Sequence, residues 1–316
     1  MIEAASHHHH SHDHNHDHGH HHHAVSIEQA TNKAFLFGIA LNLLYVIVEA
    51  ASGFITNSLA LISDAGHNFG DVIGLVLSLL ALRLAKVKPT DKFTYGYKKT
   101  TILAALANAA ILLIGIGILG YESVVRMYNP APVQGGVIAI IAAVGIVINS
   151  VSAYLFFKTQ KELNAKAAYL HLLADALVAV GVVVAGVVIK FTNWYWLDAA
   201  VSLAILLVIL VGTWNLLKES LQLSLDAVPK EIDIHDVEQI IEKNPLVKNV
   251  HHIHVWAMST TENALTAHLV IDEALQRPDI KKLIADVKHA LLHYNIQHAT
   301  LEIETTGDCT DILCDK

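Results

Sequence analysis

Six long apolar stretches constrain the fold of this chain more than any other feature of its sequence. Each is long enough to cross about 30 Å of hydrocarbon as a helix. The chain is 53% hydrophobic and only 16% charged, more apolar than an ordinary soluble protein of 316 residues. We therefore predict a membrane protein with an all-α bundle of six transmembrane helices, near residues 33–55, 58–85, 101–127, 133–158, 166–190 and 194–217.

Basic residues predict the orientation of the bundle. Lysines gather in the connections between spans two and three and between spans four and five: Lys86, Lys88, Lys92, Lys98, Lys99, Lys158, Lys161 and Lys166. Cytoplasmic loops carry an excess of Lys and Arg, so both connections are predicted to be cytoplasmic. With six spans, both termini would then lie in the cytoplasm.

The composition changes after about residue 220. Helical periodicity in residues 231–244 is followed by two strand-like segments, a second amphipathic helix and the strand-like "HATLEIET". This order predicts a small α+β domain of the αββαβ type, with an antiparallel or mixed sheet and helices on one face. The expected domains are a tail (1–30), the transmembrane bundle (31–220), the αββαβ domain (221–308) and a cysteine-containing tail (309–316).

The N-terminal tail is dominated by histidine. Residues 7–23 read "HHHHSHDHNHDHGHHHH" and contain no apolar residue. Such a segment cannot build a core and is predicted to be disordered, and it lacks the apolar region of a signal peptide. It is either an affinity tag or a native metal-gathering segment. The interrupting Asp13, Asn15, Asp17 and Gly19 favour the native segment.

Ionisable residues recur with matched spacing in the second and fifth predicted spans. His67 and Asp71 are four residues apart in "DAGHNFGD", and His171 and Asp175 are four apart in "YLHLLADAL". Residues four apart share one face of a helix, and ionisable residues inside a membrane are costly and usually functional. Two imidazoles and two carboxylates suit tetrahedral Zn²⁺, and the two negative charges balance the cation.

The same residues predict how transport would be driven. Bare carboxylates in a bilayer are costly, so protons should replace the metal when the site is empty. Because metal ligands must be deprotonated, the metal and protons compete for the same atoms. A site that alternates between the two membrane faces would therefore exchange a divalent cation for protons. Asp64, one turn before His67, is expected to support the ligands, and Glu49 and Asn108 to join helices.

At these residues the chain resembles the cation diffusion facilitator family, and specifically its bacterial zinc-efflux branch. The resemblance runs from about residue 30 to the end and rests on "SLALISDAGHNFGD", "FTYGYKKTTILAALANA", "AAYLHLLADAL", "VHHIHVW" and "HATLEIE". It implies a homodimer in the bacterial inner membrane that exports zinc or related cations from the cytoplasm using the proton gradient. It also implies that His67, Asp71, His171 and Asp175 form the transport site.

The resemblance further implies a metallochaperone-like (ferredoxin-like) cytoplasmic domain that binds zinc and strengthens the dimer. The matching candidate ligands are His251, His268, Glu304, Cys309 and Cys314. Zn²⁺ is thus expected both as the substrate and as a structural or regulatory ligand. Strand alternation predicts that His252 and His254 share the face opposite to that of His251. The cysteines of "CTDILC" are more widely spaced than in a zinc knuckle.

Two other functions remain open from the residues alone. An intramembrane zinc enzyme would keep a coordination position open for water, and the His-Glu-x-x-His motif of zinc proteases does not occur in the sequence. A membrane-anchored zinc sensor or store would leave the paired motifs unexplained. We therefore predict a transporter, not an enzyme, embedded in membrane lipid. Cd²⁺, Co²⁺ and Ni²⁺ suit similar ligands, and no nucleic acid partner is expected.

Overall fold

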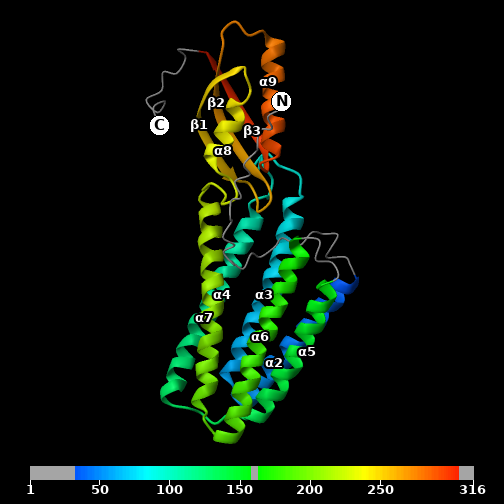
Figure 1. Ribbon diagram of the computed structural model, residues 1–316, viewed down its shortest axis with the longest axis vertical. Helices are drawn as coiled ribbons and strands as arrows, with labels where there is room; N and C mark the ends of the chain where they lie inside the picture. Colours follow the sequence, from blue (N-terminus) through cyan, green and yellow to red (C-terminus); the bar gives the residue numbers. More distant parts are fainter. Residues whose placement is uncertain (1–32, 158–162, 306–316) are drawn as a thin grey trace, which may run out of the picture.

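The computed structural model describes residues 33–157 and 163–305 (Figure 1). Long helices form a bundle in the first part of the chain, and a smaller unit of helices and strands sits at one end of it (Figure 1). The bundle helices are α2 (Lys33–Thr56), α3 (Leu59–Ala85), α4 (Thr100–Tyr128), α5 (Gly135–Phe157), α6 (Leu163–Thr192) and α7 (Trp196–Ser224). Their ends lie close to the predicted ones, except that α7 continues beyond the predicted domain division at residue 220.

Five of these helices, α3 to α7, are long and apolar enough to cross a membrane. Helix α2 contributes a shorter apolar segment, Leu43–Thr56. Many large apolar side chains on the bundle are exposed, among them Ile55, Ile118 and Leu207. A helix surface of this kind is stable in lipid and not in water. The chain is therefore a multi-pass membrane protein, as predicted.

The start of α3 is held by a carboxylate from another helix. Asp198, in the first turn of α7, accepts hydrogen bonds from the Ser58 hydroxyl (2.5 Å) and from the backbone N–H of Leu59 (2.6 Å). The first N–H groups of a helix have no hydrogen-bond acceptor within the helix. In hydrocarbon no water molecule is present to accept these bonds instead. Asp198 is only 2% exposed, so it satisfies these donors inside the bundle and fixes the point where α3 begins.

Hydroxyl groups continue this connection deeper into the bundle. Ser202 of α7 lies 2.7 Å from Ser63 of α3 and 2.7 Å from Ser123 of α4, measured between the hydroxyl oxygens. Apolar side chains gain little by packing against one another in lipid, so small residues and interhelical hydrogen bonds hold membrane helices together. The three serines therefore join α3, α4 and α7.

Helices α5 and α6 are joined by direct backbone contact. A Cβ atom added to Gly135 would lie 2.5 Å from the Gly186 carbonyl oxygen, and one added to Gly186 would lie 2.7 Å from the Ala139 nitrogen. Only glycine permits so close an approach, which is typical of small-residue packing between membrane helices. Helix α6 is thus fixed against α5, whereas α3 packs chiefly against α4, α2 and α7.

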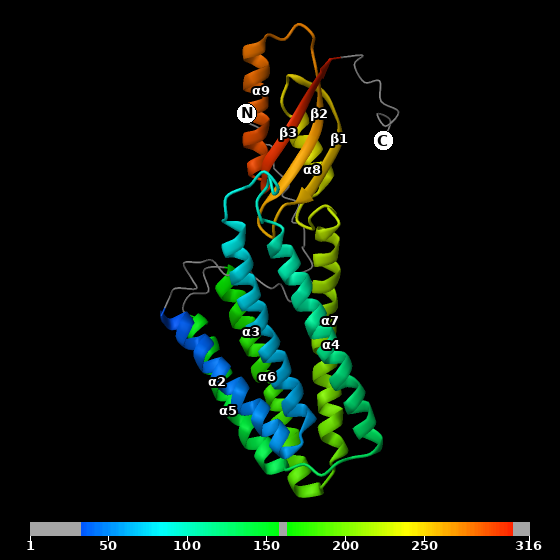
Figure 2. The same cartoon turned by 180° about the vertical axis from the view of Figure 1, so that it is seen from behind.

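The C-terminal unit, residues 234–305, consists of α8 (Ile234–Glu242), β1 (Val247–Ala257), β2 (Asn263–Ile271), α9 (Arg277–Leu292) and β3 (Ile296–Thr305). Strand β2 is central; it pairs antiparallel with β1 and parallel with β3, so the sheet is mixed, as predicted. Helices α8 and α9 bury Val237, Ile241, Leu283, Val287 and Leu291 in one core with the sheet. Figure 2 shows the strands from the side opposite to α8.

The connection between α3 and α4 meets the C-terminal unit through several separate contacts. Exposed ion pairs of this kind contribute about 0–1 kcal/mol each, so the position of the unit depends on the set and not on one pair. The contacts are the ion pair of Lys98 with Glu262, the ring contact of Tyr95 with His298 and, from the start of α4, the hydrogen bond that Thr101 Oγ1 accepts from the Thr260 N–H. Lys99 also pairs with Asp226 in the segment between α7 and α8.

We expect Asp198→Ala to lower the stability of the bundle. The substitution leaves the Ser58 hydroxyl and the Leu59 N–H buried without an acceptor, which should cost about 2–4 kcal/mol. Thermal unfolding of the detergent-solubilised protein, followed by tryptophan fluorescence, measures the loss. The control is Glu122→Ala, which removes a partly exposed ion pair with Arg126 and should change stability by less than about 1 kcal/mol. Equal unfolding midpoints for the two variants would contradict the capping role.

Candidate metal centre

The four paired residues of spans two and five meet between α3 and α6. His171 Nε2 lies 2.9 Å from Asp71 Oδ2, and His67 Nε2 lies 3.7 Å from Asp175 Oδ1, so each histidine reaches the aspartate of the other helix. Each also lies 3.6 Å from the aspartate of its own helix, one turn away. The two imidazole rings meet edge to face with their centres 5.8 Å apart. The structure thus brings all four predicted residues into one cluster.

The spacing of the donor atoms suits a small tetrahedral cation. Zinc binds histidine nitrogen and carboxylate oxygen at about 2.0–2.2 Å, which places neighbouring ligand atoms of a tetrahedron about 3.3–3.6 Å apart. The four nitrogen–oxygen distances in the cluster span 2.9–3.7 Å. Donor atoms of His67, His171 and Asp175 all lie within 4.8 Å of one another, so these three could hold one ion. Asp71 Oδ2, 2.9 Å from His171, lies next to this set and would have to move to join it.

The cluster is only partly buried. The Asp175 side chain is 8% exposed and that of His171 is 36% exposed, with His67 and Asp71 between them at 20% and 21%. A wholly enclosed site could neither load nor release an ion. His171 is thus the most exposed of the four side chains and Asp175 the most buried.

A second set of polar groups lies beside the cluster in the bundle. Asp64 is 4% exposed and interacts electrostatically with Asp175 and His67. It also interacts with Glu49 of α2, which is fully buried and accepts a 2.7 Å hydrogen bond from the Tyr45 hydroxyl. Sequence reasoning assigned Glu49 to helix packing. Glu49 and Asp64 lie on different helices, so no periodic spacing in the sequence indicates that they interact.

A histidine cluster occurs in the C-terminal unit as well. His251 of β1 and His268 of β2 are directly opposite each other, with ring centres 5.3 Å apart. Glu304 of β3 joins them: its carboxylate oxygens lie 2.5 Å from His268 Nδ1 and 3.2 Å from His251 Nε2. The structure therefore gathers the three predicted residues that it describes. Nitrogen atoms of His251, His252 and His268 also lie within 4.8 Å of one another, so these rings could hold a metal ion.

The prediction that His252 lies on the face opposite to His251 is wrong. The pairing of β1 with β2 shifts register between His251 and His254, and His252 has a left-handed backbone with φ of 50°. A bulge of this kind re-aims a side chain, and it breaks the alternation on which the prediction depended. The His252 ring lies 5.2 Å from that of His251 and 5.0 Å from that of His268, centre to centre. His252 is thus a member of the cluster, although strand alternation placed it on the other face.

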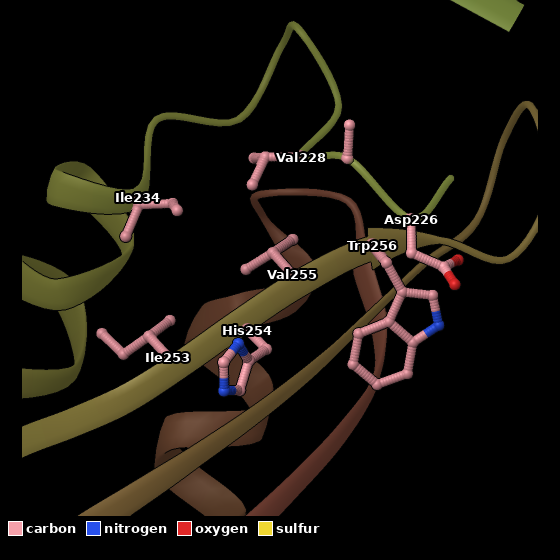
Figure 3. Close-up of a pocket in the computed structure, with 8 residues that line it drawn as sticks. Asp226, Val228, Ile234, Ile253, His254, Val255 and Trp256 are labelled. Carbon is pink, nitrogen blue, oxygen red and sulfur yellow. The ribbon is translucent and has the colours of Figure 1, made fainter. Parts of the chain in front are cut away.

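His254 lies apart, at a pocket of about 410 Å³ where β1 faces the segment after α7 (Figure 3). Ile234, Val255 and Trp256 are among the residues that line this pocket. Its Asp226 is already paired with Lys99, at 2.5 Å. The pocket contributes no second ligand-forming histidine, so we assign it no part in metal binding. The remaining predicted ligands, Cys309 and Cys314, lie outside the described residues, as does the histidine-rich tail.

Two known protein-family models match this chain. The family model described as "Cation efflux transmembrane domain" matches residues 35–223, more than half of the chain. The chain belongs to the cation efflux family. A second model, "Cation efflux protein, cytoplasmic domain", matches residues 229–306. The resemblance to the cation diffusion facilitators is therefore confirmed.

Curated relatives within the cation efflux family align along most of their length. The "Cadmium, cobalt and zinc/H(+)-K(+) antiporter" of Bacillus subtilis is 36% identical over 293 residues, covering 91% of this chain and 94% of the relative. "Metal cation efflux system protein CzcD" of Cupriavidus metallidurans is 36% identical over 279 residues, 86% of each. "Zinc transporter ZitB" of Escherichia coli is 34% identical over 281 residues, 88% of each. This cation efflux protein thus belongs to a family of transporters, not of enzymes.

We expect His252→Ala to weaken the zinc-dependent stabilisation of the full-length protein, because it removes one ring from the C-terminal cluster. Each tenfold loss of affinity lowers that stabilisation by about 1.4 kcal/mol when zinc is in excess. The rise in unfolding midpoint on adding zinc measures it. His254→Ala is the matched control, since His254 lies on the same strand and outside the cluster. If both variants lose the same stabilisation, the cluster does not use His252.

Proposed function

We propose that this cation efflux protein exports Zn²⁺ from the bacterial cytoplasm across the inner membrane in exchange for protons. His67, Asp71, His171 and Asp175 are the proposed transport site. The observation that carries the proposal is the pairing of each histidine with the aspartate of the other helix, at 2.9 and 3.7 Å. The names of the relatives above, which include zinc, cadmium, cobalt and H(+), support it.

Charge balance accounts for the exchange. Two ionised aspartates and two neutral histidines match one divalent cation, whereas the empty site would hold uncompensated carboxylates in a largely apolar bundle. Binding of protons to the same nitrogen and oxygen atoms removes that cost. Zinc can therefore occupy the site when it faces one side of the membrane, and protons can occupy it when it faces the other. In neither orientation does the site hold uncompensated carboxylates.

The packing of the bundle supports a way to move the site between the two faces. Helix α6 is bound to α5 through Gly135 and Gly186, whereas α3 is held to α4 and α7 by the three serines. Helices α3 and α6 make few backbone contacts with each other. A relative movement of the two groups would alter access to the four ligands, and it would have to rearrange the apolar contacts that α3 and α7 share with α5 and α6. A site between two rigid groups of helices is typical of alternating access in transporters.

The arrangement in the membrane is part of the same proposal. Helix α2 is the proposed sixth span, and the predicted domain divisions apply with α7 extended to Ser224. The lysine-rich connection between α3 and α4 would face the cytoplasm, with the C-terminal unit and both termini. The C-terminal unit would adopt the metallochaperone-like fold and join two chains as a homodimer. Zinc on His251, His252, His268 and Glu304 would stabilise one arrangement of that dimer and so regulate transport.

Purified protein in liposomes with an internal pH dye tests the proposal. Zinc added outside should enter the liposomes through those protein molecules whose cytoplasmic side faces outward. Protons should leave the liposomes at the same time. Asp175→Asn should reduce both fluxes at least about a hundredfold, because even groups that only orient metal ligands alter metal affinity or activity 10–100-fold. Asp272→Asn, an exposed carboxylate paired with Lys248, is the matched control and should transport normally.

Each outcome has a separate meaning. Zinc flux without a change of internal pH would contradict proton exchange but not the assignment of the transport site. Undiminished zinc flux in Asp175→Asn would contradict the site itself.

A further inference from the structure

Two histidines outside both clusters lie side by side on the surface of the C-terminal unit. His289 is in the last turn of α9 and His293 directly follows the helix, still with helical backbone angles of −68° and −15°. Both side chains are exposed. Their rings meet edge to face with centres 5.4 Å apart. Helix geometry holds the two rings on one face, so they stay together without further support.

This face points away from the core of the unit. Leu283, Val287 and Leu291 form the buried face of α9, which packs against the sheet. The His251–His252–His268 cluster is built from strand residues and contains no residue of α9. His289 and His293 could therefore bind an ion of their own, separate from any ion at the other two clusters.

The spacing of the pair suits a transition-metal cation. Two histidines at positions i and i+4 on a helix are the zinc-binding arrangement of the His-Glu-x-x-His motif. Imidazole nitrogen also suits Cu²⁺, Ni²⁺ and Co²⁺. Asp286 is exposed and lies on the same face, one turn before His289 and two turns before His293, so its carboxylate must turn toward the pair to share an ion with them. Lys282 lies one turn earlier on that face, and its exposed, flexible side chain can point its charge away from the ion.

The end of α9 lies on the side of the unit that faces the bundle. The Asn295 carbonyl oxygen, just after His293, accepts a hydrogen bond from the Asn263 side chain at the start of β2. The neighbouring Glu262 pairs with Lys98, and His298 contacts Tyr95, both in the connection between α3 and α4. Figures 1 and 2 show the same end of α9 directed toward the bundle.

We propose that His289 and His293, with Asp286 as a third ligand, form a surface site for a divalent transition-metal cation such as Zn²⁺. Two nitrogens and one oxygen leave a fourth tetrahedral position to water, as in open zinc sites. The ion can therefore exchange quickly, unlike an ion held by four protein ligands. The site would hold cations at the bundle-facing end of the C-terminal unit.

Histidine footprinting of the full-length protein tests the site directly. Diethylpyrocarbonate modifies free imidazole nitrogens, and tryptic cleavage after Lys288 releases a peptide that begins at His289 and contains His293. Zinc chloride should slow modification of both residues, by about tenfold once free zinc is ten times the dissociation constant. Chelation of the zinc should restore the original rate. The peptide extends to Lys316 and also contains His298, so fragmentation in the mass spectrometer assigns the modification to each histidine separately.

Two variants and one internal control decide the result. His293→Gln should abolish the protection of His289, and Asp286→Asn should weaken it. His235 is the internal control: it is exposed, it is the one histidine in the tryptic peptide of residues 231–243, and zinc should leave its rate unchanged. Equal modification of His289 with and without zinc would overturn the proposal. So would protection of His289 that persists in His293→Gln, because one histidine would then suffice.

Discussion

Two carboxylates held inside an apolar bundle are the constraint on which the rest of this structure depends. Neither Asp71 nor Asp175 can remain charged there without a partner, and the structure gives each a histidine from the opposite helix, at 2.9 and 3.7 Å. The resulting set is neutral with one divalent cation and also neutral with protons. The proposed exchange follows from that equivalence, because either zinc or protons can neutralise the site, whereas the empty ionised site is costly.

The surrounding helices position this site by means that do not depend on the hydrophobic effect. Asp198 fixes the start of α3, and so the height of His67 and Asp71 in the bundle. Glycine contacts fix α6 on α5, and so the positions of His171 and Asp175. Apart from the ligand residues themselves, the hydrogen bonds described above join α3 to α4 and α7. The ligands thus come from two helices, α3 and α6, that are held chiefly by different neighbours.

Much of this could be predicted from the sequence. Apolar length predicts the bundle helices, and the repeated four-residue spacing predicts the His67–Asp71 and His171–Asp175 pairs, because both signals are periodic and local. The rest could not be predicted, because it depends on contacts between distant segments. Asp198 satisfies donors 139 residues away, and nothing in its neighbourhood indicates that. His252 joins its cluster through a left-handed bulge, where strand alternation fails. Glu49 reaches Asp64 only once α2 and α3 pack together.

Proton release on zinc binding tests the central claim most directly. Calorimetric titration in buffers of different ionisation enthalpy counts the protons displaced from detergent-solubilised protein, with no membrane gradient involved. If metal and protons compete for the four intramembrane ligands, the wild type must release more protons than a variant with Asp71→Asn and Asp175→Asn. That difference must grow as the pH falls, because more ligands are then protonated before zinc arrives. Equal proton release by the two proteins at every pH would contradict the account.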